Sequence, residues 1–295
     1  LVVIAIIALL IGLLLPALAK ARKNAASLKD KTQIQQIHKS GITFANENKE
    51  KMPTPGLINR QADPSLGQQP GIGPEDFIAN TSANLYSALV AQQYFPTDLC
   101  FGTTEVNANF VPKRDYNFGA YVPANDVYWD TTFLGNPAGL LPADGSNTSY
   151  SHMAMCGVRK RQLWRNNQNS GVAAFGTRGT GGTFQGQANG GATSGDDYTK
   201  SPTLELHGPA QQWDGHVCFM DNHTESLNTF FAPGCSYLPQ SGSLSLTPTK
   251  DNIYCAEFDD YPAGAQASGD SWLVMNTAAN NTGDSITPAW DPLIN

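Results

Sequence analysis

The chain has 295 residues, of which 40% are hydrophobic, and its sequence pI is near 5.1. That length leaves room for one or two domains. The charge is divided unevenly: residues 1–52 hold eight Lys or Arg and three Asp or Glu, whereas residues 53–295 hold ten and 22. The acidic part contains no cluster of basic residues with interleaved aromatics, so we expect no nucleic-acid partner.

The first sixteen residues, LVVIAIIALLIGLLLP, contain no charged or polar side chain. As a helix they would be about 24 Å long, slightly short of a hydrocarbon core of roughly 30 Å. A cleaved signal peptide and a buried core helix are two interpretations. We favour a third, a membrane anchor that packs against copies of itself, because the helical pattern continues without a cleavage site and the segment is apolar on all sides. The residues expected in that packing are Leu1, Val2, Val3, Ile4, Ile6, Ile7, Leu9, Leu10, Ile11, Leu13, Leu14 and Leu15.

Gly12 and Pro16 mark the weakest part of this helix. Pro16 has no N–H and its ring clashes with the carbonyl group of Gly12, at a cost of about 3 kcal/mol in a helix interior. We therefore predict that the helix kinks or opens between these two residues once the segment leaves a bilayer.

Residues 1–22, LVVIAIIALLIGLLLPALAKAR, resemble the N-terminal segment of type IV pilins and type II secretion pseudopilins, in particular the prepilin-like proteins of planctomycetes. The resemblance implies an α+β, pilin-like fold, with one long N-terminal helix packed on an antiparallel sheet that carries long loops. It also implies a segment that anchors the subunit in the inner membrane and then forms the core of a helical filament. The partners would be copies of the chain and the pilus or type II secretion assembly machinery.

The helical pattern continues after Pro16. Apolar residues recur at positions 18, 21, 25, 28, 34, 37 and 44, which predicts an amphipathic helix to about Lys51 whose far half lies against the head. Met52 and Pro53 end it, so we divide the chain into a helix at 1–52 and a head at 53–295. His38 on this helix is expected to be a surface or interface residue.

The head begins with a loop and a short helix predicted at residues 81–93. A basic cluster follows at Arg159, Lys160, Arg161 and Arg165, and it either meets an acidic neighbour or is a solvated turn. Residues 170–197 are rich in Gly, Thr and Asn and are expected to form an exposed loop or hairpin, since the P-loop pattern is missing. The segment from Asn276 to the C-terminus is expected to be an extended surface strand that could reach an adjacent subunit.

A hairpin is predicted from residue 216 to residue 227. Val217–Met220 and His223–Leu227 are expected as strands joined by a tight turn at Asp221-Asn222, because Asn and Asp tolerate positive φ. His216 and Cys218 would share one face of the sheet, with Val217 and Phe219 on the other. The turn also resembles the Asp-Gly-His hairpin of the planctomycete proteins, with Asn222 in place of Gly and His223 as the His; His207 would be the leading His, at a longer spacing.

The same region offers side chains that bind metals or act as nucleophiles. His207, His216, Cys218, His223 and Cys235 are of the types that bind zinc, but none has zinc-site spacing, and we interpret the hairpin as structural. The five cysteines suggest one or two disulfides, with Cys235–Cys255 preferred. The resemblance to major pseudopilins, which hold one calcium ion in an acidic C-terminal loop, makes Asp251, Glu257, Asp259 and Asp260 candidate calcium ligands.

No convergent catalytic set occurs, so we expect no enzyme. The expected function is a structural subunit of an extracellular type IV pilus-like filament that reaches the cell surface from the inner membrane. A pseudopilin of a periplasmic type II secretion pseudopilus and a membrane-anchored surface binding module are the alternatives.

Overall fold

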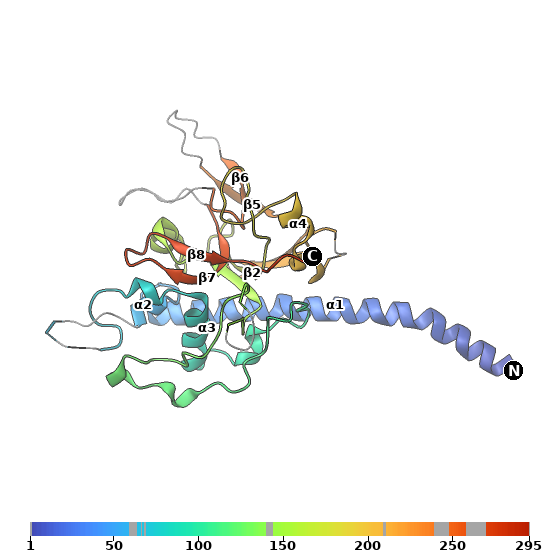
Figure 1. Ribbon diagram of the computed structural model, residues 1–295, viewed down its shortest axis with the longest axis horizontal. Helices are drawn as coiled ribbons and strands as arrows, with labels where there is room; N and C mark the ends of the chain where they lie inside the picture. The colour runs from blue at the N-terminus through green and yellow to red at the C-terminus, as the bar shows by residue number, and fades with distance from the viewer. Residues whose placement is uncertain are drawn as a thin grey trace.

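The computed structural model describes residues 2–58, 64–65, 67, 69–139, 144–208, 211–238, 248–257 and 270–294. Within them, one long helix carries a head built on an antiparallel sheet (Figure 1). The N-terminal part of that helix projects well beyond the head. This is the α+β, pilin-like arrangement that the sequence predicts.

The long helix, α1, spans Val2–Glu47, a length of about 69 Å. It ends before the expected position near Lys51 because Lys49 and Glu50 adopt positive φ angles of 57° and 63°. The helix runs unbroken through Gly12 and Pro16, and Figure 1 shows it curving toward its N-terminus. Opening of this segment outside a membrane stays a prediction.

The main sheet has six antiparallel strands in the order β4-β3-β2-β1-β7-β8. His152 in β1 pairs with Phe175 in β2 on one side and with Val274 in β7 on the other. A separate two-stranded sheet is formed by β5 and β6. The strands are β1 (Tyr150–Met153), β2 (Ala173–Thr177), β3 (Gly215–Phe219), β4 (Thr224–Leu227), β5 (Phe231–Tyr237), β6 (Thr249–Asn252), β7 (Leu273–Ala279) and β8 (Ile286–Ala289).

The shorter helices are α2 (Pro55–Ile58), α3 (Ser82–Ala91) and α4 (Asp196–Thr199), with a π-helix at Arg159–Leu163. The helix expected at residues 81–93 is confirmed as α3. The Thr81 side chain accepts a hydrogen bond from the Asn84 backbone N–H, which satisfies one of the N–H groups left open at the start of a helix.

Each face of the main sheet packs against its own hydrophobic core. On one face, Ile34, Ile37 and Phe44 of α1 meet side chains of α3 and the sheet; on the other, Val217 and Phe219 pack in a second core with residues from β5. The predicted alternation along β3 is confirmed, because Cys218 belongs to the α1 side. The far half of the amphipathic stripe therefore lies against the head, as expected.

The exposed loop or hairpin predicted at residues 170–197 is confirmed only in part. Residues 182–189 and 193–197 are mostly exposed, whereas residues 172–180 are buried and contain β2 at the centre of the sheet. Two glycines allow close packing here: a Cβ on Gly176 would lie 2.9 Å from the Leu273 side chain, and one on Gly179 would lie 2.3 Å from the Tyr254 ring. Glycine is required in this segment for contact rather than for flexibility.

Other sequence predictions also need correction. Leu18 and Leu28 of the expected stripe are exposed, because the head contacts only the later part of α1 and Leu28 lies on its outer side. The surface strand expected from Asn276 onward is confirmed in part: Asn276 itself is fully buried inside β7, whereas β8 is the edge strand of the main sheet and three of its four residues are exposed or half-buried.

Candidate functional site

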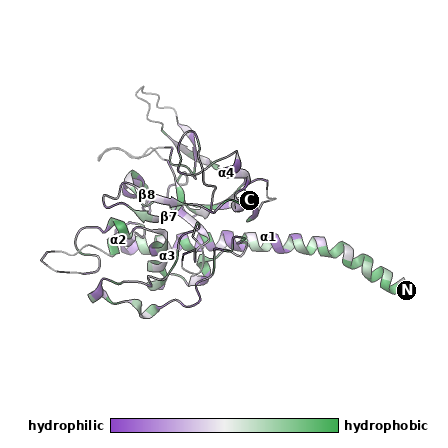
Figure 2. Cartoon of the chain, in the orientation of Figure 1, coloured by the Kyte–Doolittle hydropathy of each residue, from purple (hydrophilic) through white to green (hydrophobic). Residues whose placement is uncertain are grey.

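The apolar end of α1 is the most unusual surface of the molecule. Its large side chains are between half and three-quarters exposed, from Ile7 at 50% to Ile4 at 70%. Figure 2 shows the end as a continuous hydrophobic rod outside the head. Among the described residues, α1 is the one helix long and apolar enough to cross a membrane, a property that an anchor and a signal sequence share. The exposed large residues from Val3 to Leu15 are the ones the sequence predicts to pack; Leu1 and the Val2 side chain lie outside the description.

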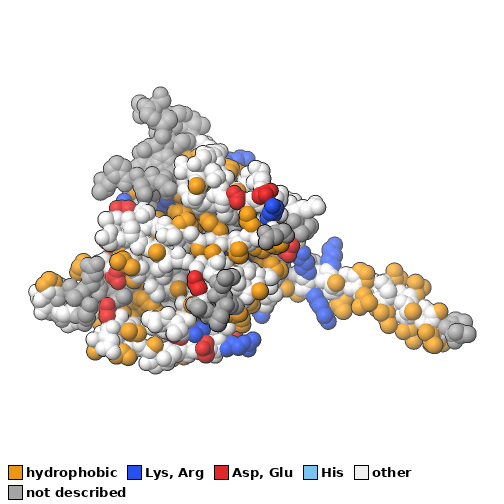
Figure 3. Space-filling model, viewed as in Figure 1, with side chains coloured by type: hydrophobic (Ala, Val, Ile, Leu, Met, Phe, Trp, Pro, Cys, Tyr) orange, Lys and Arg blue, Asp and Glu red, His pale blue; other side chains and the backbone are white. Residues whose placement is uncertain are grey.

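Positive charge follows the apolar end directly. Lys20, Arg22, Lys23 and Lys29 are exposed on α1, and Figure 3 shows Lys and Arg side chains between the apolar end and the head. Lys23 Nζ donates a 2.8 Å hydrogen bond to the Gly208 carbonyl group, so the head begins to contact α1 here. Along α1, an exposed apolar segment is followed by an exposed basic segment and then by the docked segment, which packs against the head. The head therefore leaves the apolar segment open to contact with other molecules.

Asp30 connects α1 to the head through a buried carboxylate. Its side chain accepts hydrogen bonds from Thr103 N at 2.7 Å and Oγ1 at 2.8 Å, and from the Thr104 hydroxyl, and it lies 3.1 Å from His207 Nε2. Burial raises the pKa of Asp30, but hydrogen bonds from His207, Thr104 and Thr103 outweigh that effect, and the pKa lies below its usual value. Asp30 is therefore a charged anchor in the helix–head junction.

His216 lies beside this anchor on β3. Its Nε2 lies 2.8 Å from the Ser27 hydroxyl of α1, its Nδ1 lies 3.1 Å from the Ser226 hydroxyl, and its ring lies 4.7 Å from the His207 ring. Burial is the main cause that lowers the pKa of His216 to about 4, and the neighbouring His207 and Lys31 add to it. Since both nitrogens of His216 and of His207 have hydrogen-bond partners, these residues fit a structural junction better than a zinc site.

The predicted hairpin turn is confirmed, and it also binds α1. Asn222 has a φ of 69°, its carbonyl oxygen accepts a hydrogen bond from Gln35, and its Oδ1 lies 3.0 Å from His38 Nδ1. His38 is fully buried, so its expected surface or interface position was wrong. The face of α1 that packs against the head was correctly predicted, but no local pattern predicted that the hairpin turn contacts His38.

The remaining hairpin residues support the turn. His223 Nδ1 lies 2.5 Å from Asp221 Oδ1, and the His223 ring stacks on Phe219 with centroids 4.3 Å apart. Burial raises the pKa of the Cys218 thiol, which opposes the thiolate form needed for a nucleophile. The hairpin therefore shows no activated thiol–histidine pair.

An acidic cluster lies near β6. One carboxylate oxygen each from Asp251, Glu257 and Asp270 falls within 4.8 Å of the others. Burial and the two neighbouring carboxylates raise the pKa of Asp251, and burial and Asp270 raise that of Glu257. Asp251 Oδ1, completely buried, and Glu257 Oε2 accept no hydrogen bond from the described part of the chain. Arg159 forms an ion pair with Asp270, which neutralises one of the three charges.

This cluster differs from the predicted calcium set. Asp251 and Glu257 belong to both, whereas Asp259 and Asp260 lie outside the described residues. Asp270 was missed because it is far from the other acids in sequence and only the fold brings it to β6. Three oxygen ligands of this kind suit a hard divalent cation.

The expected Cys235–Cys255 disulfide is absent, and none of the described residues forms a disulfide bond. Cys235 packs in the core beneath the sheet, while Cys255 Sγ lies 3.2 Å from Asn189 Oδ1. Both thiols are buried, and each has its own contacts. The short spacing between Cys235 and Cys255 suggested a disulfide, but the fold does not join the two thiols.

Comparison with known proteins adds no assignment. No protein-family model, curated protein or solved structure matches the chain. The candidate sites are therefore the exposed apolar end of α1, the junction that fixes the head to it, and the acidic cluster.

Proposed function

We propose that the chain is a structural subunit of an extracellular type IV pilus-like filament. The observation that carries this proposal is the exposed apolar end of α1, which has no contact with the described head. A cylinder that is hydrophobic on all sides needs lipid or other apolar helices around it. Copies of the same segment supply such surroundings, and the resemblance of residues 1–22 to pilins and pseudopilins supports this assembly.

Burial of this segment is a strong driving force. Each fully buried Leu, Ile or Val side chain contributes about 1.5–3 kcal/mol, and ten large side chains from Val3 to Leu15 are exposed. Because these side chains are half to about two-thirds exposed, the gross gain is about 8–20 kcal/mol, which is comparable with or larger than the usual cost of association of about 4–15 kcal/mol. Assembly therefore requires no covalent chemistry, and we propose no enzymatic activity.

The two surfaces of α1 have separate roles in this proposal. The docked segment of α1 binds the head through Asp30, through His38 and through the contact of Ser27 with His216 of β3. The head therefore stays fixed while the apolar end packs with its neighbours. The apolar end first anchors the subunit in the inner membrane, and assembly machinery then transfers it into the filament. Identical heads coat the outside.

A pseudopilin of a type II secretion system shares the same apolar segment and differs in the length and location of its filament. A membrane-anchored binding module would use the segment only as an anchor. Sheared cell-surface material separates the three, because only the pilus-like subunit yields long external filaments made of this chain.

Substitutions in the apolar end test the proposal. Leu9→Ala with Leu13→Ala keeps the segment apolar enough for membrane insertion but removes packing volume, so we expect much less filament with an unchanged amount in the membrane fraction. Ile78→Ala with Val106→Ala is the matched control, because it truncates two apolar side chains that are exposed on the head. Equal filament yields from the two double variants would contradict the proposal.

We also propose that the acidic cluster binds one calcium ion. The support is the buried Asp251 oxygen without a hydrogen bond and the raised pKa values of two carboxylates, which show that ionising the cluster is unfavourable without added positive charge. Its role would be to fix β6 and the segment before β7 in the head.

A further inference from the structure

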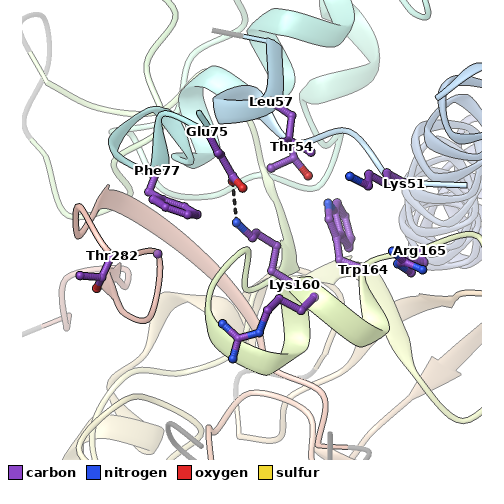
Figure 4. A pocket seen from close by; sticks show the side chains of 11 residues that line it. Lys51, Thr54, Leu57, Glu75, Phe77, Lys160, Trp164, Arg165 and Thr282 are labelled. Atoms are coloured by element: carbon purple, nitrogen blue, oxygen red, sulfur yellow. Dashed lines mark hydrogen bonds and ion pairs between the residues drawn. The ribbon is translucent and has the colours of Figure 1, made fainter. Parts of the chain in front are cut away.

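A cavity of about 340 Å³ lies at the end of the head farthest from the apolar segment. Its walls come from α2, from the π-helix Arg159–Leu163 and from the turn between β7 and β8. Figure 4 shows Trp164 and Lys160 rising into it, with Glu75 and Phe77 on one side and Lys51 on the other. The cavity lies apart from the apolar end of α1, the helix–head junction and the acidic cluster.

The lining is positively charged, although the head as a whole is acidic. Four lining residues are cations, Lys51, Lys160, Arg161 and Arg165, and one is an acid, Glu75. Residues 53–295 hold 22 acidic and ten basic residues, so a cavity lined by four cations and one acid differs from the average charge of the head. The basic cluster at 159–165 that the sequence singles out supplies three of the four cations.

Two of these cations are already neutralised within the chain. Lys160 Nζ lies 2.5 Å from Glu75 Oε1 and 4.4 Å from the centre of the Phe77 ring. Arg161 lies 3.6 Å from Asp284 in a largely exposed pair. From the sequence, the basic cluster could either meet an acidic neighbour or be a solvated turn. Lys160 and Arg161 each have an acidic neighbour.

Lys51 and Arg165 are in a different situation. They are direct partners in an antiparallel β-bridge, held by hydrogen bonds from Asn166 N to the Glu50 carbonyl group and from Met52 N to the Trp164 carbonyl group. Like charges at opposite positions of such a pair are unfavourable. Within the described part of the chain, neither side chain has an ion-pair partner. The fold thus places the backbones of Lys51 and Arg165 side by side, and both side chains line the cavity.

We propose that this cavity binds an anionic oxygen group, a carboxylate, sulfate or phosphate, as a small ion or on one unit of an acidic saccharide. Lys51 and Arg165 supply the charge, and an Arg side chain can bind such a group through two parallel hydrogen bonds. Trp164 and Leu57 give an apolar wall. The volume is at the lower end of the range of about 300–1,000 Å³ for ligand pockets, which suits a molecule of about one sugar unit.

Calorimetric titration of the full chain in a non-ionic detergent at low salt tests the proposal. The probes are glucuronate, glucose, inorganic phosphate and inorganic sulfate. Lys51→Gln with Arg165→Gln removes the two charges of the bridge. Arg114→Gln with Lys200→Gln is the matched control, because it removes the same charge from exposed positions outside the cavity. The melting temperature of both double variants confirms that each is folded.

The proposal expects glucuronate to bind and glucose not to bind, with the affinity for glucuronate at least about tenfold weaker in the Lys51/Arg165 variant and unchanged in the control. Tighter binding of glucuronate than of phosphate and sulfate identifies an acidic saccharide as the source of the anion, and equal binding identifies the anionic group alone. No binding by any anion, or equal loss in both double variants, would overturn the proposal.

Discussion

Asp30 of α1 and His207 of the head meet across the helix–head junction, with Oδ2 and Nε2 3.1 Å apart and both side chains almost completely buried. Thr103 and Thr104 complete the shell around the carboxylate. The contact follows the Lys23–Gly208 and Ser27–His216 hydrogen bonds along α1, and it places a buried carboxylate in the junction. We therefore expect it to stabilise the attachment of the head to the helix.

Removal of the Asp30 charge should loosen this attachment. Asp30→Asn weakens the charge-assisted hydrogen bonds from Thr103 and Thr104, and we expect a loss of about 1–3 kcal/mol in the free energy of unfolding. Chemical denaturation of the full chain in detergent measures it. Asp98→Asn, which changes an exposed carboxylate, is the control and should cost much less. A similar effect of both changes would mean that Asp30 has no special role at the junction.

Three buried histidines should make the head less stable in acid. Burial lowers the pKa of His38, His152 and His216 to about 4 in each case. For each of them the unfolded chain, in which His has a pKa near 6.5, binds more protons than the folded chain between these values, so the contribution of the histidine to stability falls as the pH decreases from about 6.5 to about 4. Each histidine should contribute about 1–3 kcal/mol to this loss. Asp251 and Glu257, whose pKa values are raised, act in the opposite direction, so the effect of a histidine is measured as a difference between variants.

Melting temperatures from pH 8 to pH 4 measure the effect. His152→Gln removes one titrating group that is completely buried and should flatten the decline, whatever its effect at pH 8. His223→Gln, a change at the partly exposed histidine of the hairpin, is the comparison. An equal decline in the parent chain and in His152→Gln would contradict this prediction.

Calcium should stabilise the chain most at alkaline pH. The folded-state pKa values of Asp251 and Glu257 are raised, so their ionisation lowers stability as the pH rises, and a bound cation offsets that loss. We expect calcium chloride to raise the melting temperature at pH 8, to have little effect at pH 5, and to have none in Asp251→Asn. Magnesium should act more weakly, because it prefers a smaller, octahedral site. An unchanged melting temperature at pH 8 would refute the site.

The sequence predicted those parts of the fold that depend on local patterns. Thr81 before an apolar helix, and Asp221-Asn222 between two short strands, are local signals, and both elements formed where expected. The far half of the stripe on α1 was also correct, because helical periodicity decides which face is buried. The long apolar start of the chain indicated the helix that projects from the head.

Features that depend on distant contacts could not be predicted in this way. The Gly-rich segment looked flexible, yet Gly176 and Gly179 are needed because Leu273 and Tyr254 approach closely, and both partners lie far along the chain. Asp270 lies near Asp251 because the segment before β7 packs against β6, where Ser271 N donates a 2.8 Å hydrogen bond to Asp251 Oδ2. The hydrogen bond between His38 Nδ1 and the accepting Asn222 Oδ1 links residues 184 positions apart, which no local pattern reports.

We propose that the apolar end of α1 packs among copies of itself in a filament. Electron cryomicroscopy of filaments sheared from cells, with the subunit identified by mass spectrometry, tests this packing. We expect filaments of this chain in which residues 3–15 of neighbouring subunits pack along the axis and the heads lie outside. Isolated particles in which the same residues fold against their own head would contradict it.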